Sequence, residues 1–279
     1  MTLQNIIKNG SLFLKNKKIK THLLDSEIIL ANIMGISREY LLTNEKEKIS
    51  KSLYGKFRQA IIKRSQNEPV AYINKKKEFW SINFFVNKST LIPRPETELL
   101  INETLKFVED KKINVLDIGT GSGCILLSFL TELKKAKGVG IDVSSEAIEI
   151  AKKNSRMLNL SKRSNFYVFN VDKLDQGNYD LVISNPPYVC TKDIKNLDEQ
   201  IVKYEPLVAL NGGIDGLDVI RKIVRKSREI LKRNGILAIE VGNGQYSSVS
   251  EILELNNFQE LSRVVDFEEN VRCIISTRK

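Results

Sequence analysis

The most informative part of the sequence is Leu181-Val182-Ile183-Ser184-Asn185-Pro186-Pro187-Tyr188. Its apolar start is typical of a buried strand in a parallel sheet. Two consecutive prolines cannot continue a strand, so the chain must leave the sheet in a stiff, extended conformation. Ligands of open α/β sheets bind outside the carboxyl ends of the strands. The sequence therefore predicts a binding site at Asn185.

The polar groups of this loop suit a flat chemical group that carries an NH2. The Asn185 amide can both donate and accept hydrogen bonds, whereas the Pro186 carbonyl can only accept. Tyr188 adds an aromatic face beside these two acceptors. A plain proline-rich turn is the alternative that these four residues alone leave open.

A glycine-rich segment, Gly119-Thr120-Gly121-Ser122-Gly123-Cys124, lies between a predicted strand at residues 114–118 and a predicted helix at residues 125–133. Alternate glycines let the backbone approach a ligand closely at a helix amino terminus. Cys124 stands where the dinucleotide fingerprint would need its third glycine. The segment therefore favours a ligand without a pyrophosphate, and S-adenosylmethionine is such a ligand.

Two further strand ends carry candidate ligand contacts. The predicted strand at residues 138–142 ends in Asp142, 23 residues after Gly119, which matches a carboxylate that accepts hydrogen bonds from ribose hydroxyls. Asn170 and Asp172 follow the predicted strand at residues 166–169. Either could bond an adenine amino group, and the sequence leaves both open.

From residue 113 onward, strands alternate with helices, which is the pattern of a parallel sheet. The remaining predicted helices lie at residues 145–158, 217–231 and 246–255, and the remaining strands at 180–184, 236–240, 258–265 and 271–276. No helix separates the last two strands, so they should form an antiparallel hairpin at the sheet edge. We expect residues 192–200 to be a polar loop.

The first part of the chain has a different pattern. Apolar residues recur at helical spacing between residues 3 and 66, which predicts a bundle of four or five short helices. The aromatic run at residues 78–86 predicts a small hairpin between two domains, with its centre at Ser81–Asn83. We therefore expect a helical domain at residues 1–77, a hairpin linker at 78–92 and a sheet domain at 93–279.

The excess positive charge lies in the helical part. Residues 1–77 contain 16 Lys and Arg against 6 Asp and Glu, whereas residues 78–279 contain 28 of each. Such a basic module can steer toward a nucleic acid or an acidic partner, and a solvated lysine-rich surface is the equally open alternative.

Cysteine and histidine usage excludes several kinds of site. Three distant cysteines fit neither a disulfide framework nor a zinc site, and with His22 as the only histidine we expect no metal and no His-based catalysis. The first residues do not resemble a secretory signal, and no apolar run approaches the roughly 18 residues of a membrane span. We expect a cytoplasmic protein that does not bind membranes.

Pro93-Arg94-Pro95-Glu96-Thr97-Glu98 precedes these motifs and predicts a helix that starts at Pro95 or Glu96. Together with Asp117-Ile118-Gly119-Thr120-Gly121-Ser122-Gly123, Asp142, Asn185-Pro186-Pro187-Tyr188 and Tyr204-Glu205-Pro206, in this order, it resembles bacterial peptide chain release factor glutamine methyltransferases, the PrmC/HemK family. The resemblance covers essentially the whole chain. Members often have an acid and an aromatic residue where this chain has Asn170-Val171-Asp172.

The resemblance implies a class I S-adenosylmethionine-dependent methyltransferase with a Rossmann-like seven-stranded sheet of order 3-2-1-4-5-7-6, preceded by a helical domain. It implies methylation of the side-chain N5 of the glutamine in a Gly-Gly-Gln motif of release factors, with S-adenosylhomocysteine as product. The residues implied for catalysis are Asn185, Pro186 and Tyr188. Those for cofactor binding are Asp117, Gly119, Thr120, Gly121, Ser122, Gly123, Asp142, Asn170 and Asn185, and those for substrate binding are Asn185, Pro186, Pro187, Tyr188, Arg94, Glu96 and Glu205.

The Asn-Pro-Pro-Tyr loop is also shared with DNA and RNA base amino-methyltransferases, which are the alternative function. Against that alternative, the basic region has few aromatic residues that could stack on bases. We therefore expect release factors as partners, no direct contact with nucleic acid, and a monomer. A non-catalytic module is the third interpretation, and the intact Asn185 and glycines argue against it.

Overall fold

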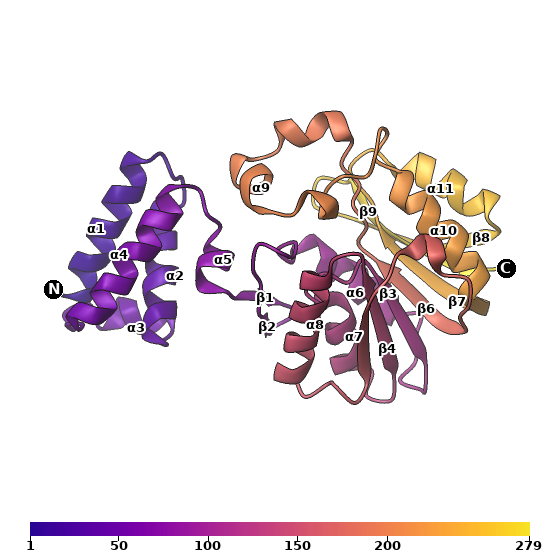
Figure 1. The fold of residues 1–279 in the computed structure, drawn as a ribbon, viewed down its shortest axis with the longest axis horizontal. Coiled ribbons are helices and arrows are strands. Elements are labelled where there is room, and N and C mark those ends of the chain that lie inside the picture. Colours follow the sequence, from indigo (N-terminus) through magenta and orange to yellow (C-terminus); the bar gives the residue numbers. More distant parts are fainter. The chain divides into compact units, whose positions relative to one another are not determined.

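The computed structural model describes residues 1–279, which divide into two compact units (Figure 1). The helical unit comprises Met1–Lys76 and Asp198–Tyr204, and the sheet unit comprises Lys77–Leu197 and Glu205–Lys279. None of the helices is both long enough and apolar enough to span a membrane.

The helical unit contains the short helices that the apolar spacing predicts. They are α1 (Leu3–Asn16), α2 (His22–Met34), α3 (Arg38–Thr43), α4 (Lys51–Ser65) and α5 (Val70–Asn74). Thr2, Ser37 and Ser50 cap α1, α3 and α4 by accepting a hydrogen bond from a backbone N–H in the first turn. One apolar cluster holds the bundle together, with Leu3, Ile29, Leu41 and Phe57 among its buried members.

Residues 191–196 and 199–204 are helical, so the polar loop expected at residues 192–200 is a wrong prediction. The structure forms a 3-10 helix, η2 (Thr191–Asn196), and α9 (Glu199–Tyr204), which belongs to the helical unit. Asn67 Nδ2 donates to Glu199 Oε2 at 2.7 Å, and the Tyr204 hydroxyl donates to the Gln66 carbonyl at 2.8 Å. Such short helices depend on tertiary contacts, and their sequence carries no amphipathic pattern.

The sheet unit contains a seven-stranded sheet of order β5-β4-β3-β6-β7-β9-β8. In chain order the strands are β3 (Asn114–Ile118), β4 (Lys137–Asp142), β5 (Ser164–Val168), β6 (Tyr179–Ser184), β7 (Leu231–Glu240), β8 (Phe258–Val265) and β9 (Val271–Arg278). The first five pair in parallel, and β9 pairs antiparallel with both β7 and β8. This arrangement confirms the implied strand order and the closing hairpin.

Helices cover both faces of the sheet (Figure 1). Alternate strand residues point to opposite faces, so Val115 packs in one apolar cluster and Leu116 in the other. The first cluster includes residues of α6 (Glu96–Leu105), α7 (Cys124–Glu132) and α8 (Ser145–Met157), and the second includes residues of α10 (Asp218–Ile230) and α11 (Tyr246–Leu255).

The predicted hairpin exists and packs into the sheet unit. Strands β1 (Lys77–Phe79) and β2 (Ile82–Phe84) pair antiparallel around Trp80 and Ser81, whose φ angles of 52° and 55° suit a tight hairpin turn. The turn therefore lies one residue earlier than expected. Phe79 and Phe84 are buried in an edge-to-face pair, with ring centroids 6.2 Å apart, within the core of the sheet unit.

The helical unit also contains a buried ion pair, Asp25 with Arg64, at 2.6 Å. Replacing Arg64 by Ala leaves a buried carboxylate without its charged partner, and we expect the unit to lose about 3–5 kcal/mol of unfolding free energy. Hydrogen exchange of the α2 and α4 amides measures this loss. The exposed Arg58 on the same helix is the matched control, and its Ala variant should change stability by less than about 0.5 kcal/mol.

Trp80, the single tryptophan, lies in the sheet unit, so its fluorescence reports whether that unit stays folded in the Arg64→Ala variant. Equal, small changes in both variants would contradict a stabilising role of the ion pair.

Candidate active site

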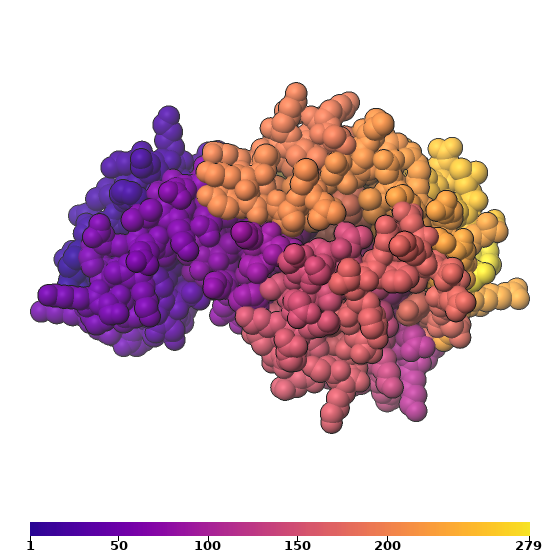
Figure 2. Space-filling view, in the orientation of Figure 1, coloured from indigo at the N-terminus to yellow at the C-terminus, as the bar shows by residue number.

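A cavity of about 250 Å³ lies in the sheet unit at the carboxyl ends of its parallel strands. Ile118, Asp142 and Asn185 line it from the ends of β3, β4 and β6, and residues of 89–91, 169–171 and 206–209 complete the wall. In the space-filling view, orange atoms from the later part of the sheet unit lie above pink atoms from its middle part, so segments distant in sequence share this face (Figure 2). The sheet thus gathers residues distant in sequence around one space, as the motifs predict.

The glycine loop forms one side of the cavity. Gly119 and Gly121 line it, with φ angles of +74° and +54°, which residues with a side chain rarely adopt. A Cβ atom at Gly119 would lie 4.0 Å from the Asn185 carbonyl oxygen, so the glycine loop and the Pro-Pro loop face one another. Gly123 has another role, because a Cβ there would be 3.2 Å from Ala151 Cβ, where α7 packs against α8.

Asp142 is held firmly at the cavity. Its Oδ2 accepts a hydrogen bond from the Gly121 N–H at 2.9 Å, and its Oδ1 accepts one from the Ser144 N–H at 3.0 Å. Burial raises the pKa of this carboxyl, while the backbone N–H groups act in the opposite direction. Each oxygen keeps acceptor capacity, so the carboxylate can receive the hydroxyl groups of a sugar.

Four residues expected to bind the cofactor do not line the cavity: Asp117, Thr120, Ser122 and Gly123. Asp117 is fully buried behind the loop, where its Oδ2 accepts a hydrogen bond from the Thr120 hydroxyl at 2.7 Å and its Oδ1 has no partner. Burial raises the pKa of Asp117 to about 7. In the structure, the hydrogen bond between Asp117 and Thr120 stabilises the glycine loop outside the cavity wall.

The residues after β5 separate the two adenine candidates. Asn170 lines the cavity, and its Oδ1 accepts a hydrogen bond from the Asp172 N–H at 2.9 Å. Asp172 does not line it and forms an ion pair with Lys222 at 2.8 Å. Ile118, Ile141, Val171 and Val219 give the cavity apolar walls, which suit a flat ring.

Asn185 begins a chain of hydrogen bonds that leads away from the cavity. Its Nδ2 donates to Thr97 Oγ1 at 3.0 Å, and the Thr97 hydroxyl donates to Glu240 Oε2 at 2.7 Å. The Tyr188 hydroxyl donates to the other oxygen, Glu240 Oε1, at 3.3 Å. Glu240 is fully buried, which raises its pKa to about 7.

The Pro-Pro loop contributes only part of its residues to the cavity. Asn185 and Pro187 line it, whereas Pro186 is buried and Tyr188 lies outside the wall. Burial, together with the neighbouring Glu240, raises the pKa of Tyr188 well above its usual range. Tyr188 is therefore a neutral hydrogen-bond donor inside the fold.

A second loop supports the Pro-Pro loop, and the sequence interpretation missed it. Val189 bridges to Asn211, and the Gly212 N–H donates to the Val189 carbonyl at 2.9 Å. Gly216 has a φ angle of +77°, and a Cβ atom there would lie 2.4 Å from the Tyr188 carbonyl oxygen. Three glycines within residues 212–216 were the available signal for this close approach.

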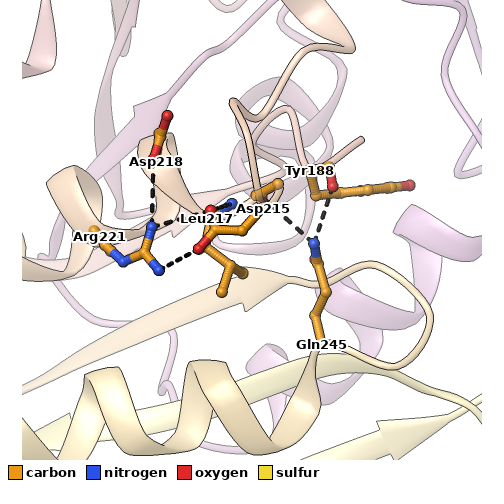
Figure 3. A network of polar contacts seen from close by, with 7 residues as sticks. Tyr188, Asp215, Leu217, Asp218, Arg221 and Gln245 are labelled. Atoms are coloured by element: carbon orange, nitrogen blue, oxygen red, sulfur yellow. Dashed lines mark hydrogen bonds and ion pairs between the residues drawn. The ribbon is translucent and has the colours of Figure 1, made fainter. Parts of the chain in front are cut away.

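Gln245 connects the two loops (Figure 3). Its Nε2 donates to the Tyr188 carbonyl at 3.0 Å, and it points toward the loop that carries Asp215 and Leu217. Arg221 pairs with Asp215 and Asp218 from the first turn of α10 and lowers the pKa of Asp215 to about 2. These polar contacts hold the loop at residues 212–218 in place. That loop and Gln245 in turn hold the Tyr188 carbonyl, which follows Pro187.

The expected substrate residues Arg94, Glu96 and Glu205 do not line the cavity. Arg94 Nη2 lies 2.6 Å from Glu205 Oε1, and the Ile92 N–H donates to Glu205 Oε2 at 3.3 Å. The Glu205 carboxylate is buried, so the structure uses it to connect two loops beside the cavity. Glu96, in the first turn of α6, lies near Glu240 and raises its pKa.

Comparison with known proteins agrees with both units. Residues 5–74 match the PrmC N-terminal domain, and residues 109–269 match a methyltransferase domain. A solved methyltransferase from Pyrococcus furiosus aligns with 79% of this chain and 97% of its own, at 16% identity and a TM-score of 0.53, a likeness of fold.

Curated relatives extend the match over nearly the whole length. The release factor glutamine methyltransferase of Caulobacter vibrioides is 35% identical over 95% of this chain and 92% of its own. That of Clostridium acetobutylicum is 34% identical over 100% of this chain and 99% of its own. The chain therefore belongs to the release factor glutamine methyltransferase family.

Proposed function

We propose that this chain transfers the methyl group of S-adenosylmethionine to the side-chain amide nitrogen of the glutamine in a Gly-Gly-Gln motif of peptide chain release factors, leaving S-adenosylhomocysteine. One observation carries the proposal. Asn185 lines the same cavity as the glycine loop and Asp142, so a side chain that can bind an amide and a carboxylate that can accept sugar hydroxyls face one space. The names of the relatives supply the substrate class.

The residues of the cavity wall fit the cofactor. Asp142 would accept the ribose hydroxyls, because its carboxylate oxygens reach the cavity and retain free lone pairs. Asn170, rather than Asp172, would contact the adenine amino group, since Asp172 is engaged with Lys222. Gly119 and Gly121 let the backbone lie close to the ligand.

When bound, S-adenosylmethionine supplies an electrophilic methyl group on a sulfonium. An amide nitrogen is a poor nucleophile because its lone pair is delocalised into the carbonyl. Asn185 Oδ1 would accept an N–H bond of the glutamine, orienting the nitrogen and stabilising positive charge on it. Positioning of this kind is worth up to about 7–11 kcal/mol of the barrier and needs no strong base. The departing proton passes to water.

The helical unit would recognise the release factor. Residues 1–77 carry the whole net charge of +10, and exposed charge mainly raises association rates. We further propose that the enzyme acts as a monomer in the cytoplasm and does not bind nucleic acid directly.

Mass spectrometry of a purified release factor after incubation with this protein and methyl-labelled S-adenosylmethionine tests the proposal. We expect one methyl group on the glutamine of the Gly-Gly-Gln peptide. A labelled DNA or RNA base, with an unlabelled release factor, would instead favour the base amino-methyltransferase that shares the Asn-Pro-Pro-Tyr loop.

Asp142→Ala should weaken S-adenosylmethionine binding about 10- to 150-fold, because it removes hydrogen bonds of roughly 1.5–3 kcal/mol to a charged partner. Isothermal titration calorimetry measures the affinity. Asp180, at the opposite end of β6, is the matched control, and its Ala variant should bind like the wild type. Unchanged affinity in Asp142→Ala would remove this residue from the site.

Asn185→Ala should lower the turnover number about 5- to 150-fold, because one substrate N–H then stays unpaired in a desolvated cavity at a cost of about 1–3 kcal/mol. Affinity for S-adenosylmethionine should persist, since Asp142 and the glycine loop are intact. The exposed Asn165 in β5 provides the control substitution. A wild-type rate in Asn185→Ala would mean that the loop only shapes the cavity.

Charge removal tests the role of the helical unit. Replacing the exposed Lys56, Arg58 and Lys63 of α4 by Gln should raise the Michaelis constant for an intact release factor at low salt, and less so at high salt. The constant for a short Gly-Gly-Gln peptide should not change. Gln variants of Lys135, Lys137 and Lys162, exposed in the sheet unit, remove the same charge elsewhere. Equal effects of the two triple variants would show that only net charge matters.

A further inference from the structure

Glu240 is buried at the carboxyl end of β7 and reaches the cavity only through other side chains. Thr97, in the first turn of α6, lies between Glu240 and Asn185 and is 2% exposed. Thr97 Oγ1 lies 2.7 Å from Glu240 Oε2 and 3.0 Å from Asn185 Nδ2. Three separate elements, α6, β7 and the loop after β6, thus meet in one polar contact inside an apolar core.

The positions of the hydrogen atoms in these two hydrogen bonds determine the orientation of the Asn185 amide. A carboxylate can only accept hydrogen bonds, so the single Thr97 hydrogen points to Glu240. The Thr97 oxygen must then accept a hydrogen bond, and the NH2 of Asn185 is the donor within reach. The amide oxygen of Asn185 is therefore left as the acceptor that can serve the cavity.

A protonated Glu240 would remove this constraint. The acid could donate to Thr97, whose hydrogen could then point to the Asn185 oxygen, and the amide could turn over. The NH2 group would then face the cavity and meet the NH2 of a glutamine, donor against donor. Only the charged form of Glu240 fixes the productive orientation.

We propose that Glu240 is a positioning residue that acts through the Thr97 hydroxyl to hold the Asn185 amide with its oxygen toward the substrate. This inference rests on the proposed function, because the orientation favours catalysis only when the substrate carries an NH2 group. It adds two residues, Thr97 and Glu240, to the site residues that the resemblance implies.

The surroundings of Glu240 contain charges of both signs. Tyr188 donates to it, and Arg272 on β9 lowers its pKa, whereas burial and Glu96 on α6 raise it. Cys273, its register partner on β9, is neutral because burial and Glu240 itself raise the thiol pKa. Arg272 also forms an ion pair with Asp266, in which Arg272 Nε lies 3.6 Å from Asp266 Oδ2.

Substitution of Thr97 tests the relay directly. Thr97→Val keeps the shape and removes the hydroxyl, so the turnover number should fall about tenfold or more, with the Michaelis constant for S-adenosylmethionine unchanged. Thr97→Ser keeps the hydroxyl and should stay within about threefold of the wild type. Thr104→Val is the control, because Thr104 is equally buried on the same helix and bonds only the Leu100 carbonyl. Turnover of Thr97→Val equal to that of Thr104→Val, or equal losses in the Val and Ser variants of Thr97, would overturn the relay.

A readout without catalysis separates this inference from the proposed function. The side-chain NH2 of Asn185, identified in asparagine-labelled protein by its absence from Asn185→Ala, should exchange slowly with solvent in the wild type and in Thr97→Ser. It should exchange rapidly in Thr97→Val, as the exposed Asn165 does. If the wild type methylates no release factor, the proposed function fails while this measurement still tests the orientation. Rapid exchange in the wild type would refute the orientation itself.

The charge of Glu240 has its own test. With both substrates saturating, the turnover number should fall as the pH decreases through about 7, because the carboxylate then takes up a proton. Glu240→Gln does not titrate, so this acid limb should disappear. An identical acid limb in Glu240→Gln would show that another group titrates and that the charge of Glu240 does not fix the amide.

Discussion

Parallel pairing of β3, β4, β6 and β7 is the constraint on which the site depends. Because these strands run in one direction, their carboxyl ends meet at a single edge of the sheet. Gly119, Asp142, Asn185 and Glu240 each occupy or directly follow such an end. Residues more than 100 positions apart in the chain thereby act on one small space.

That edge places polar groups in an apolar environment, where unpaired donors and acceptors are costly. In this fold, the buried donors and acceptors form hydrogen bonds with one another. Asp142 receives two backbone N–H groups, Glu205 receives Arg94 and a backbone N–H, and Glu240 receives two hydroxyls. The same bonds that reduce the cost of burial also fix the directions in which the remaining lone pairs point. Structure and chemistry are coupled in these few residues.

Much of the fold was predictable because its signals are local. Alternation of apolar strands with amphipathic helices, the glycines after β3 and the prolines after β6 each act within a few residues. The region at 191–204 escaped prediction because α9 and η2 are too short for a periodic pattern and depend on distant contacts such as Asn67 with Glu199. The hairpin turn was displaced by one residue because Trp80 and Ser81 adopt positive φ angles that neither residue signals.

The motifs indicated residues that line the cavity, but they did not indicate the buried residues that hold those residues in place. Gly119, Asp142, Asn170 and Asn185, which the motifs indicate, all line one cavity. Thr97 lies within the Pro93–Glu98 motif and Glu240 lies in no motif. Neither was expected in the site, because the role of Thr97 depends on Asn185, 88 residues away, and that of Glu240 depends on Thr97, 143 residues away. Conversely, Asp117 and Glu205 belong to the motifs, yet the structure engages their carboxylates inside the fold.

A crystal structure of the protein with S-adenosylhomocysteine and a Gly-Gly-Gln peptide tests most directly how Asn185 binds the substrate amide. We expect the glutamine nitrogen to lie within about 2.7–3.2 Å of Asn185 Oδ1, with Asn185 Nδ2 still bonded to Thr97. A glutamine whose carbonyl accepts from Asn185 Nδ2, or a peptide bound outside the cavity, would contradict this expectation.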